Sequence, residues 1–215
     1  MKKTLMSWAV IGTVLGLTNP VHSATISFKA NLDAGQVVSN PNSSSAKGLA
    51  KFVLDSELNQ LSYVLSLDGL DLKPVIGNRT EFNDVNKIHL HAGASGQTGP
   101  HVLNVFGLPS EDDKDLVVDF KNESLSGIWN DGDAIDPLTG QAFDQTVGGT
   151  TKFLSNFIDE LKEGNLYLAV HTAGFNGGVA IRGQIERVPE PSTLLSTIAV
   201  ATFGLMLWKR KSQVF

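Results

Sequence analysis

Four histidines in the middle of the chain have spacings that suit a metal site. His89 and His91 are separated by one residue, so on a β-strand both imidazoles lie on one face, about 6–7 Å apart. A Gly-rich loop then leads to His101, and His171 ends a later apolar run. Because imidazole is a good ligand for Cu and Zn, the four histidines predict a copper or zinc site. The alternative is that they make structural hydrogen bonds inside a β-barrel.

Arg182 is a further residue whose type and position indicate a role. It stands in an apolar run beside Gly183, which indicates close backbone packing. Its guanidinium can donate to main-chain carbonyls or to a carboxylate, so we expect it to buttress the structure. A role in holding a ligand near His171 is the alternative.

A short acidic loop is the third candidate site. Asp131, Asp133 and Asp136 are spaced around Gly132, as carboxylates are in calcium loops. The bidentate Glu that completes an EF-hand does not follow. The pattern therefore predicts either calcium binding or a plain Asp-rich turn.

Short β-strands must position these residues. Apolar and polar residues alternate with period two, and Gly, Asn, Asp and Ser separate the runs. The expected strands are Ala24–Leu32, Leu49–Leu54, Leu61–Leu67, Lys87–His91, His101–Phe106, Leu116–Phe120, Leu166–His171 and Val179–Ile185. Helical spacing from Phe153 to Leu161 predicts one short helix. A cap at Thr150 or Thr151 would begin the helix, and Gly164 would end it. This pattern predicts an all-β domain, a Greek-key β-sandwich or barrel.

Composition excludes several classes of protein. The 215 residues contain no Cys, which excludes disulfides, thiol nucleophiles and thiolate-bound metals. Residues 24–187 hold 12 Lys and Arg against 21 Asp and Glu, a net charge of −9 that disfavours nucleic-acid binding. The sequence has no Gly-x-Ser-x-Gly motif, no His-Glu-x-x-His motif and no catalytic-triad spacing. We therefore expect residues 24–187 to form one domain without catalytic activity.

Residues 1–23 have the organisation of a secretory signal. Lys2 and Lys3 precede an apolar run from Leu5 to Leu17, and we expect signal peptidase to cut after Ser23. A signal helix that stays as an uncleaved anchor is the alternative, although the run is shorter than the roughly 20 apolar residues of a membrane span. The pattern predicts an exported protein.

Residues 188–215 have three parts. Pro189, Glu190 and Pro191 are followed by a mostly apolar run at 192–208 and a basic end at 209–211. The run is a candidate transmembrane helix, and the basic end would stay cytoplasmic. The order resembles the PEP-CTERM sorting tail of Gram-negative bacteria. The resemblance implies recognition by an exosortase-type membrane enzyme and anchoring in the cell envelope before any processing.

The region between the two ends resembles the CHRD domain, named from chordin. The motifs that carry the resemblance are His89-Leu90-His91-Ala92-Gly93, Gly99-Pro100, the stretch from Gly164 to Thr172, and Ile181-Arg182-Gly183-Gln184-Ile185. It covers about Thr25 to Glu186 and implies a β-sandwich with an extracellular role and no established enzymatic activity. It also implies that Gly93 and Thr172 support the site.

Two positions depart from the family pattern. Val179-Ala180 stands where Gly-Glu is usual, which removes a carboxylate. His101 follows Gly99-Pro100 where the family usually has an aliphatic residue, so His101 is either an addition to the site or an exposed strand start. The stretch from Glu111 to Gly149 is also longer and more polar than a minimal member needs.

Three functions agree with these observations. The first is a cell-surface or matrix domain that binds a surface protein, an exopolysaccharide or a metal without catalysis. The second is a redox metalloprotein, because the order of the histidines is similar to that of copper/zinc superoxide dismutases, an analogy that carries little weight for function. The third is a structural biofilm component with no specific ligand.

Overall fold

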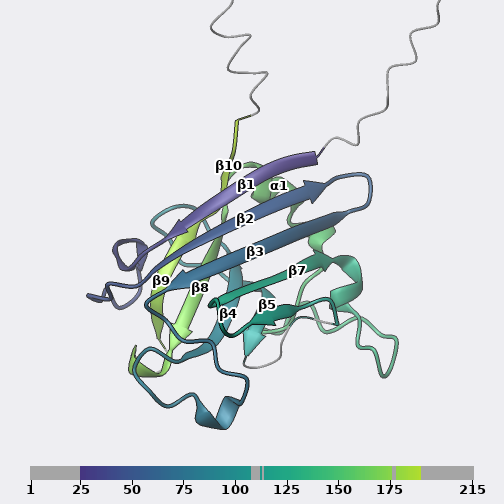
Figure 1. The fold of residues 1–215 in the computed structure, drawn as a ribbon. Helices are drawn as coiled ribbons and strands as arrows, with labels where there is room; N and C mark the ends of the chain where they lie inside the picture. Colours follow the sequence, from purple (N-terminus) through teal and green to yellow (C-terminus); the bar gives the residue numbers. More distant parts are fainter. Residues whose placement is uncertain (1–24, 108–111, 113, 176–177, 190–215) are drawn as a thin grey trace, which may run out of the picture.

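The computed structural model describes residues 25–107, 112, 114–175 and 178–189, which form two antiparallel sheets (Figure 1). The large sheet has the order β10-β1-β2-β3-β7-β6, and the small sheet has the order β5-β4-β8-β9. The strands are β1 (Thr25–Leu32), β2 (Lys47–Asp55), β3 (Gln60–Asp68), β4 (Val85–Ala92), β5 (His101–Gly107), β6 (Val117–Asp119), β7 (Ser124–Asn130), β8 (Leu166–Thr172), β9 (Val179–Gln184) and β10 (Glu186–Arg187). In Figure 1 the strands β8 and β9 run behind the large sheet and across its direction, as in a sandwich.

Helical structure is brief in the part of the chain that the structure describes. The helix α1 covers Ile158–Lys162, and the 3-10 turns are η1 (Ala34–Gln36), η2 (Ile76–Asn78), η3 (Asp131–Ala134), η4 (Leu154–Asn156) and η5 (Ala173–Phe175). The prediction of an all-β domain with one short helix is confirmed.

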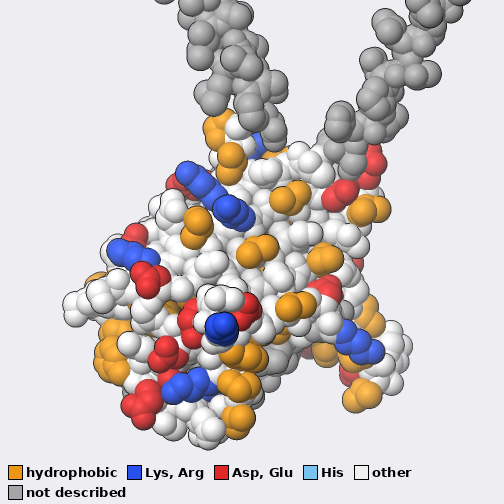
Figure 2. All heavy atoms as spheres, viewed as in Figure 1, with side chains coloured by type: hydrophobic (Ala, Val, Ile, Leu, Met, Phe, Trp, Pro, Cys, Tyr) orange, Lys and Arg blue, Asp and Glu red, His pale blue; other side chains and the backbone are white. Residues whose placement is uncertain are grey.

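The alternation of the sequence decides which face of the large sheet is buried. In β3, Leu61, Tyr63 and Leu65 are buried, while Ser62 and Val64 are exposed. Figure 2 shows the outer face of this sheet, where hydrophobic side chains are scattered among polar ones. The buried face packs on the small sheet and supplies half of one continuous core.

All eight expected strands are present, but the sequence pattern missed the two-residue strand β10 and the longer strand β7. The strand β7 lies in the large sheet between β3 and the edge strand β6. Its sequence alternates as Leu125, Gly127 and Trp129 on the buried side. Because Gly127 interrupts the apolar set, the strand was not recognised within the polar stretch from Glu111 to Gly149.

The expected cap of the helix was wrong. Phe157 precedes α1 and makes no side-chain cap bond. Thr150 and Thr151 are used elsewhere: the Thr150 hydroxyl donates to two loop carbonyls, and the Thr151 hydroxyl accepts from Asn104 of β5. The expected end is confirmed, since Gly164 has a φ of +75°, the left-handed conformation that follows many helices.

Both chain ends with expected targeting roles lie outside the described residues. These are the signal segment 1–23 and, beyond Pro189, the apolar run 192–208 with its basic end. Among the residues that are described, no helix has the length and apolar character needed to cross a membrane. The strands β1 and β10 pair with each other, so the first and last described strands lie side by side.

Gly183 allows the two sheets to approach closely beside the small sheet's outer strand. The residue after β1, Asp33, exchanges two backbone hydrogen bonds of 3.0 Å with Arg182 of β9. A Cβ at position 183 would lie 2.7 Å from the Asn31 carbonyl oxygen and 2.9 Å from the Leu32 side chain. The close packing expected from Gly183 is therefore present.

We predict that Gly183→Ala destabilises the protein by about 1–3 kcal/mol, because the added methyl group must displace the backbone of β1. Gly148→Ala is the matched control, since a Cβ there meets nothing within 4 Å. Urea unfolding followed by circular dichroism measures both variants. Equal unfolding free energies for the two would contradict the close approach.

Candidate functional site

His89, His91 and His171 lie on the outer face of the small sheet, where the adjacent strands β4 and β8 place them. In β8, Leu168 and Val170 belong to the core, so the intervening Tyr167, Ala169 and His171 project from the opposite face. In β4, Ile88 and Leu90 belong to the core in the same way, which turns His89 and His91 outward. The period-two pattern that builds the core therefore also builds the site.

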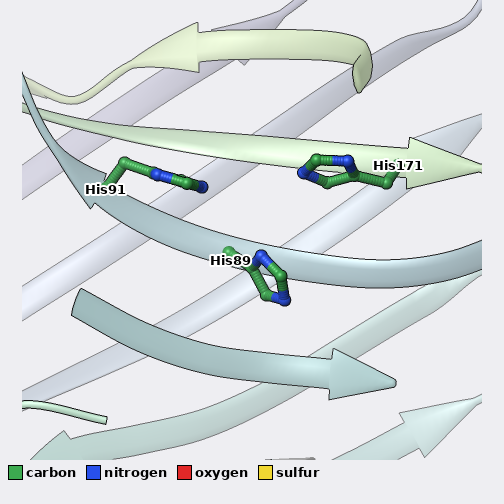
Figure 3. A group of neighbouring side chains, drawn as sticks. All are labelled: His89, His91 and His171. Carbon is green, nitrogen blue, oxygen red and sulfur yellow. The ribbon is translucent and has the colours of Figure 1, made fainter. Parts of the chain in front are cut away.

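Three of the four histidines come together. One ring nitrogen from each of His89, His91 and His171 lies within 4.8 Å of the others. Figure 3 shows His91 and His171 pointing toward each other along the sheet, with His89 beside the space between them. The register explains this, because His89 pairs with Ala169 and His171 is its diagonal neighbour on the same face.

His101 lies next to this group without belonging to it. It pairs with His91 across the β4–β5 ladder. Its ring meets that of His89 edge-on at 4.3 Å and that of His91 at 5.5 Å between centroids. Among the described residues, the close set of ring nitrogens consists of those of His89, His91 and His171. All four predicted histidines are thus neighbours, and three have ligand-like convergence.

Burial favours the neutral form of His91 and His101. Burial lowers the pKa of His91, the Gly99 carbonyl opposes that shift, and the positive charges of Arg182 and Lys87 add to it. Burial also lowers the pKa of His101 to about 3, helped by His89 and His91. A neutral imidazole is the form that binds a metal ion, so no proton has to be displaced from these two residues at pH 7.

The tautomer of His91 is set by the Gly-rich loop. Its Nδ1 lies 3.1 Å from the carbonyl oxygen of Gly99. A carbonyl only accepts hydrogen bonds, so Nδ1 carries the proton and Nε2 keeps the lone pair. Within the described part of the chain this Nε2 is buried and has no hydrogen-bond partner. A buried acceptor without a donor costs free energy, and a metal ion would satisfy it.

Tyr167 and Arg182 hold His91 and the loop together. The Tyr167 ring stacks on His91, with 5.0 Å between centroids and 7° between planes, and its hydroxyl accepts from the Gly99 backbone at 3.2 Å. The Arg182 guanidinium lies 3.5 Å from the centre of the same ring. Arg182 also donates to the carbonyls of Gln97 and Ala94. The arginine therefore binds main-chain carbonyls of the loop that sets the His91 tautomer.

Gln184 and the two expected supporting residues complete the surroundings. The Gln184 amide donates to the carbonyls of Gly93, Gly164 and Leu166. A Cβ at Gly93 would lie 3.1 Å from Tyr167, so the glycine leaves room for the tyrosine ring. Thr172 follows His171, is fully buried and by alternation faces the core side. Gly93 therefore lies beside the site, while Thr172 lies beneath the sheet.

The acidic loop uses its carboxylates as backbone acceptors. Asp131 accepts from Ser155, Asp133 accepts from Asn130 in a capping box, and Asp136 accepts from Leu138. These bonds are the ordinary Asp chemistry of turns and short helices. The described residues do not bring the three carboxylates into one metal-binding group, and calcium binding there stays a prediction.

Sequence reasoning did not single out Tyr167, Gln184 or Lys87 as parts of the site. Lys87 lies opposite His171 in the β4–β8 ladder and two residues before His89, on the same face. The sequence could have indicated Lys87, since residues 87, 89 and 91 share one face of any strand. The roles of Tyr167 and Gln184 depend on strand order, which the sequence does not show.

The donor set fits a nitrogen-binding metal. Zn–N bonds of about 2.0–2.1 Å put tetrahedral ligand atoms about 3.4 Å apart. The observed limit of 4.8 Å is wider, so modest rotations of the three rings would close the site. Three neutral nitrogens leave room for a fourth ligand, and they suit Cu and Zn better than the oxygen-seeking Ca.

A comparison with known protein families finds a match over the region that contains the two sheets. The family model of the CHRD domain matches residues 28–185, from β1 to the residue after β9. No curated protein matches the chain.

We predict that acid destabilises the metal-free protein through the buried histidines. Unfolding restores a pKa near 6.5, whereas folding holds the pKa of His101 at about 3. The contribution is complete above pH 6.5 and is lost as the pH falls toward 3, by about 1.4 kcal/mol per pH unit for each such histidine. Urea unfolding in EDTA between pH 7 and pH 4 should therefore show a shallower slope for His101→Asn than for the wild type. Identical slopes would contradict the shift.

Proposed function

Because this chain belongs to the CHRD domain family, we propose that it is an exported cell-surface or matrix domain that binds one copper or zinc ion without catalysing a reaction. His89, His91 and His171 would hold the ion. His101 packs against the rings of His89 and His91 beside the site. The metal would act by stabilising this face of the domain for contact with a surface protein or an exopolysaccharide.

The observation that carries the metal proposal is the convergence of three imidazole nitrogens within 4.8 Å on a rigid sheet. Two further features support it. The His91 tautomer leaves Nε2 as an acceptor, and burial favours neutral rings. A site held by two paired strands and a bonded loop needs little reorganisation on binding, which favours affinity.

We predict that the full-length protein, purified in mild detergent, binds one Cu²⁺ or Zn²⁺ per chain. Replacing two ligands in His89→Asn/His171→Asn should weaken the affinity at least about 100-fold, because one imidazole cannot hold the ion alone. Mass spectrometry of bound metals and calorimetric titration measure this. Saturation at 100 times the Kd should also raise the unfolding free energy by about 2.7 kcal/mol.

Lys51→Gln is the control, since Lys51 is exposed on the large sheet and a loss of affinity there would indicate nonspecific damage. Equal affinity of the wild type and the double histidine variant would overturn the site. Dismutation of superoxide by the copper-loaded protein above the rate of free copper, lost in the double variant, would overturn the non-catalytic proposal in favour of a redox metalloprotein.

Sorting is the second part of the proposal. It rests on the order Pro-Glu-Pro, apolar run and basic end in residues 188–215. Signal peptidase would process the start of the chain, and an exosortase-type enzyme would recognise the end. Because β1 pairs with β10, both attachments leave the domain at one edge of the large sheet. The histidines belong to the small sheet, which is the other layer of the sandwich.

We predict that deleting residues 188–215 releases the exported domain as a soluble protein, because the deletion removes the apolar run and the three cations that would retain it. The full chain should stay in the membrane fraction. Cell fractionation with immunoblotting measures both. A second deletion that removes residues 1–23 should leave the protein in the cytoplasm. Retention of the tail-deleted protein in the membrane would contradict the sorting proposal.

A further inference from the structure

The small sheet has a charge opposite to that of the rest of the domain. None of its four strands contains Asp or Glu, although residues 24–187 have a net charge of −9. The same strands contain Lys87 and Arg182 beside the four histidines. The loop over the site, Ala92–Pro100, also lacks acids. The acids of this domain lie elsewhere in the chain.

This distribution matters for a bound divalent metal. Three neutral imidazoles leave the ion with its full charge of about +2. Many metal sites reduce that charge with a carboxylate or thiolate ligand, and the group formed by His89, His91 and His171 has neither. Partial burial makes an uncompensated charge costly. The remaining coordination position is therefore the place where negative charge is most strongly favoured.

Lys87 adds to this positive field and is available to a ligand. It faces His171 across the β4–β8 ladder and shares a face with His89. Its charge reaches the group, since it is one of the two cations that act on His91. Its ammonium makes no hydrogen bond or ion pair with any residue that the structure describes.

Arg182, the other cation, already uses its guanidinium in contacts within the protein. It is 3 % exposed, lies against the Tyr167 ring and donates to Gln97, Ala94 and Gln184. Its role is to hold the loop, and it has few donors left for a ligand. Lys87 is half-buried, and its long flexible stem can bring the ammonium toward the metal position.

We propose that the fourth coordination position of the metal site binds a small anion, and that Lys87 is the residue that selects for it. This inference rests on the proposed metal site and names the class of its exogenous ligand. An anionic donor would complete the coordination of the ion, offset its charge and pair with the Lys87 ammonium, which has no partner among the described residues. A neutral donor such as water would complete the coordination, but it would neither offset the charge of the ion nor pair with the ammonium.

The test is an azide titration of the copper-loaded full-length protein, followed by its ligand-to-metal charge-transfer absorbance. Lys87→Met should weaken azide binding about tenfold. It should leave Cu²⁺ affinity unchanged or tighter, because removing a neighbouring cation favours a cation. Structural damage would weaken both affinities, so the opposite signs identify the charge effect. Lys87→Arg should restore azide binding, and Lys51→Met is the control on the large sheet.

The outcomes separate this inference from the metal site itself. Failure of the wild type to bind copper would overturn the proposed function, and this inference with it. Copper binding without azide binding, or with equal azide affinity in Lys87→Met, would overturn the anion inference alone. Acetate and galacturonate as competitors identify the source: displacement of azide by both assigns the position to carboxylates, including those of acidic polysaccharides, and no displacement assigns it to inorganic anions.

Discussion

The alternation of side chains along β4 and β8 is the constraint on which the rest of the structure depends. Ile88, Leu90, Leu168 and Val170 must face the large sheet to form the core. The residues between them are then forced to the other face, where His89 and His171 become diagonal neighbours. A slip of one residue in either strand would turn the core residues away from the large sheet and the histidines toward it. Burial of the apolar residues therefore fixes the positions of the histidines on the opposite face of the same strands.

Hydrogen bonds between the sheet and the Gly-rich loop then fix the tautomer of His91. The loop Ala92–Pro100 has little apolar surface of its own, so it depends on bonds from the sheet. Arg182 and Gln184 bind its carbonyls, and Tyr167 binds the amide of Gly99. The Gly99 carbonyl then fixes which nitrogen of His91 bears the proton. Residues distant in sequence therefore decide which nitrogen of this candidate ligand bears the proton, in the way that neighbouring hydrogen-bond partners orient metal ligands generally.

Much of the fold was predictable because period two is a local signal. The strands around Phe52, Tyr63 and Leu168 follow from it directly. The strand β7 did not, since Gly127 replaces an apolar residue where the Tyr63 hydroxyl needs the space. The helix cap failed for a similar reason: Thr151 bonds to β5, which lies 47 residues away from it in sequence. Local patterns cannot reveal a partner that only the folded chain brings close.

The sequence predicts which types of residue form the site, but it does not predict which of these residues lie close together. The spacing of His89 and His91 places both on one face of any strand, but only the order β5-β4-β8 brings His101 and His171 beside them. The same order places Lys87 opposite His171. Sequence alone reports a net negative domain, whereas the fold gathers its histidines with Lys87 and Arg182 on a sheet without acids. Because electrostatic selectivity depends on local charge rather than net charge, this face can favour anions on a protein that as a whole repels them.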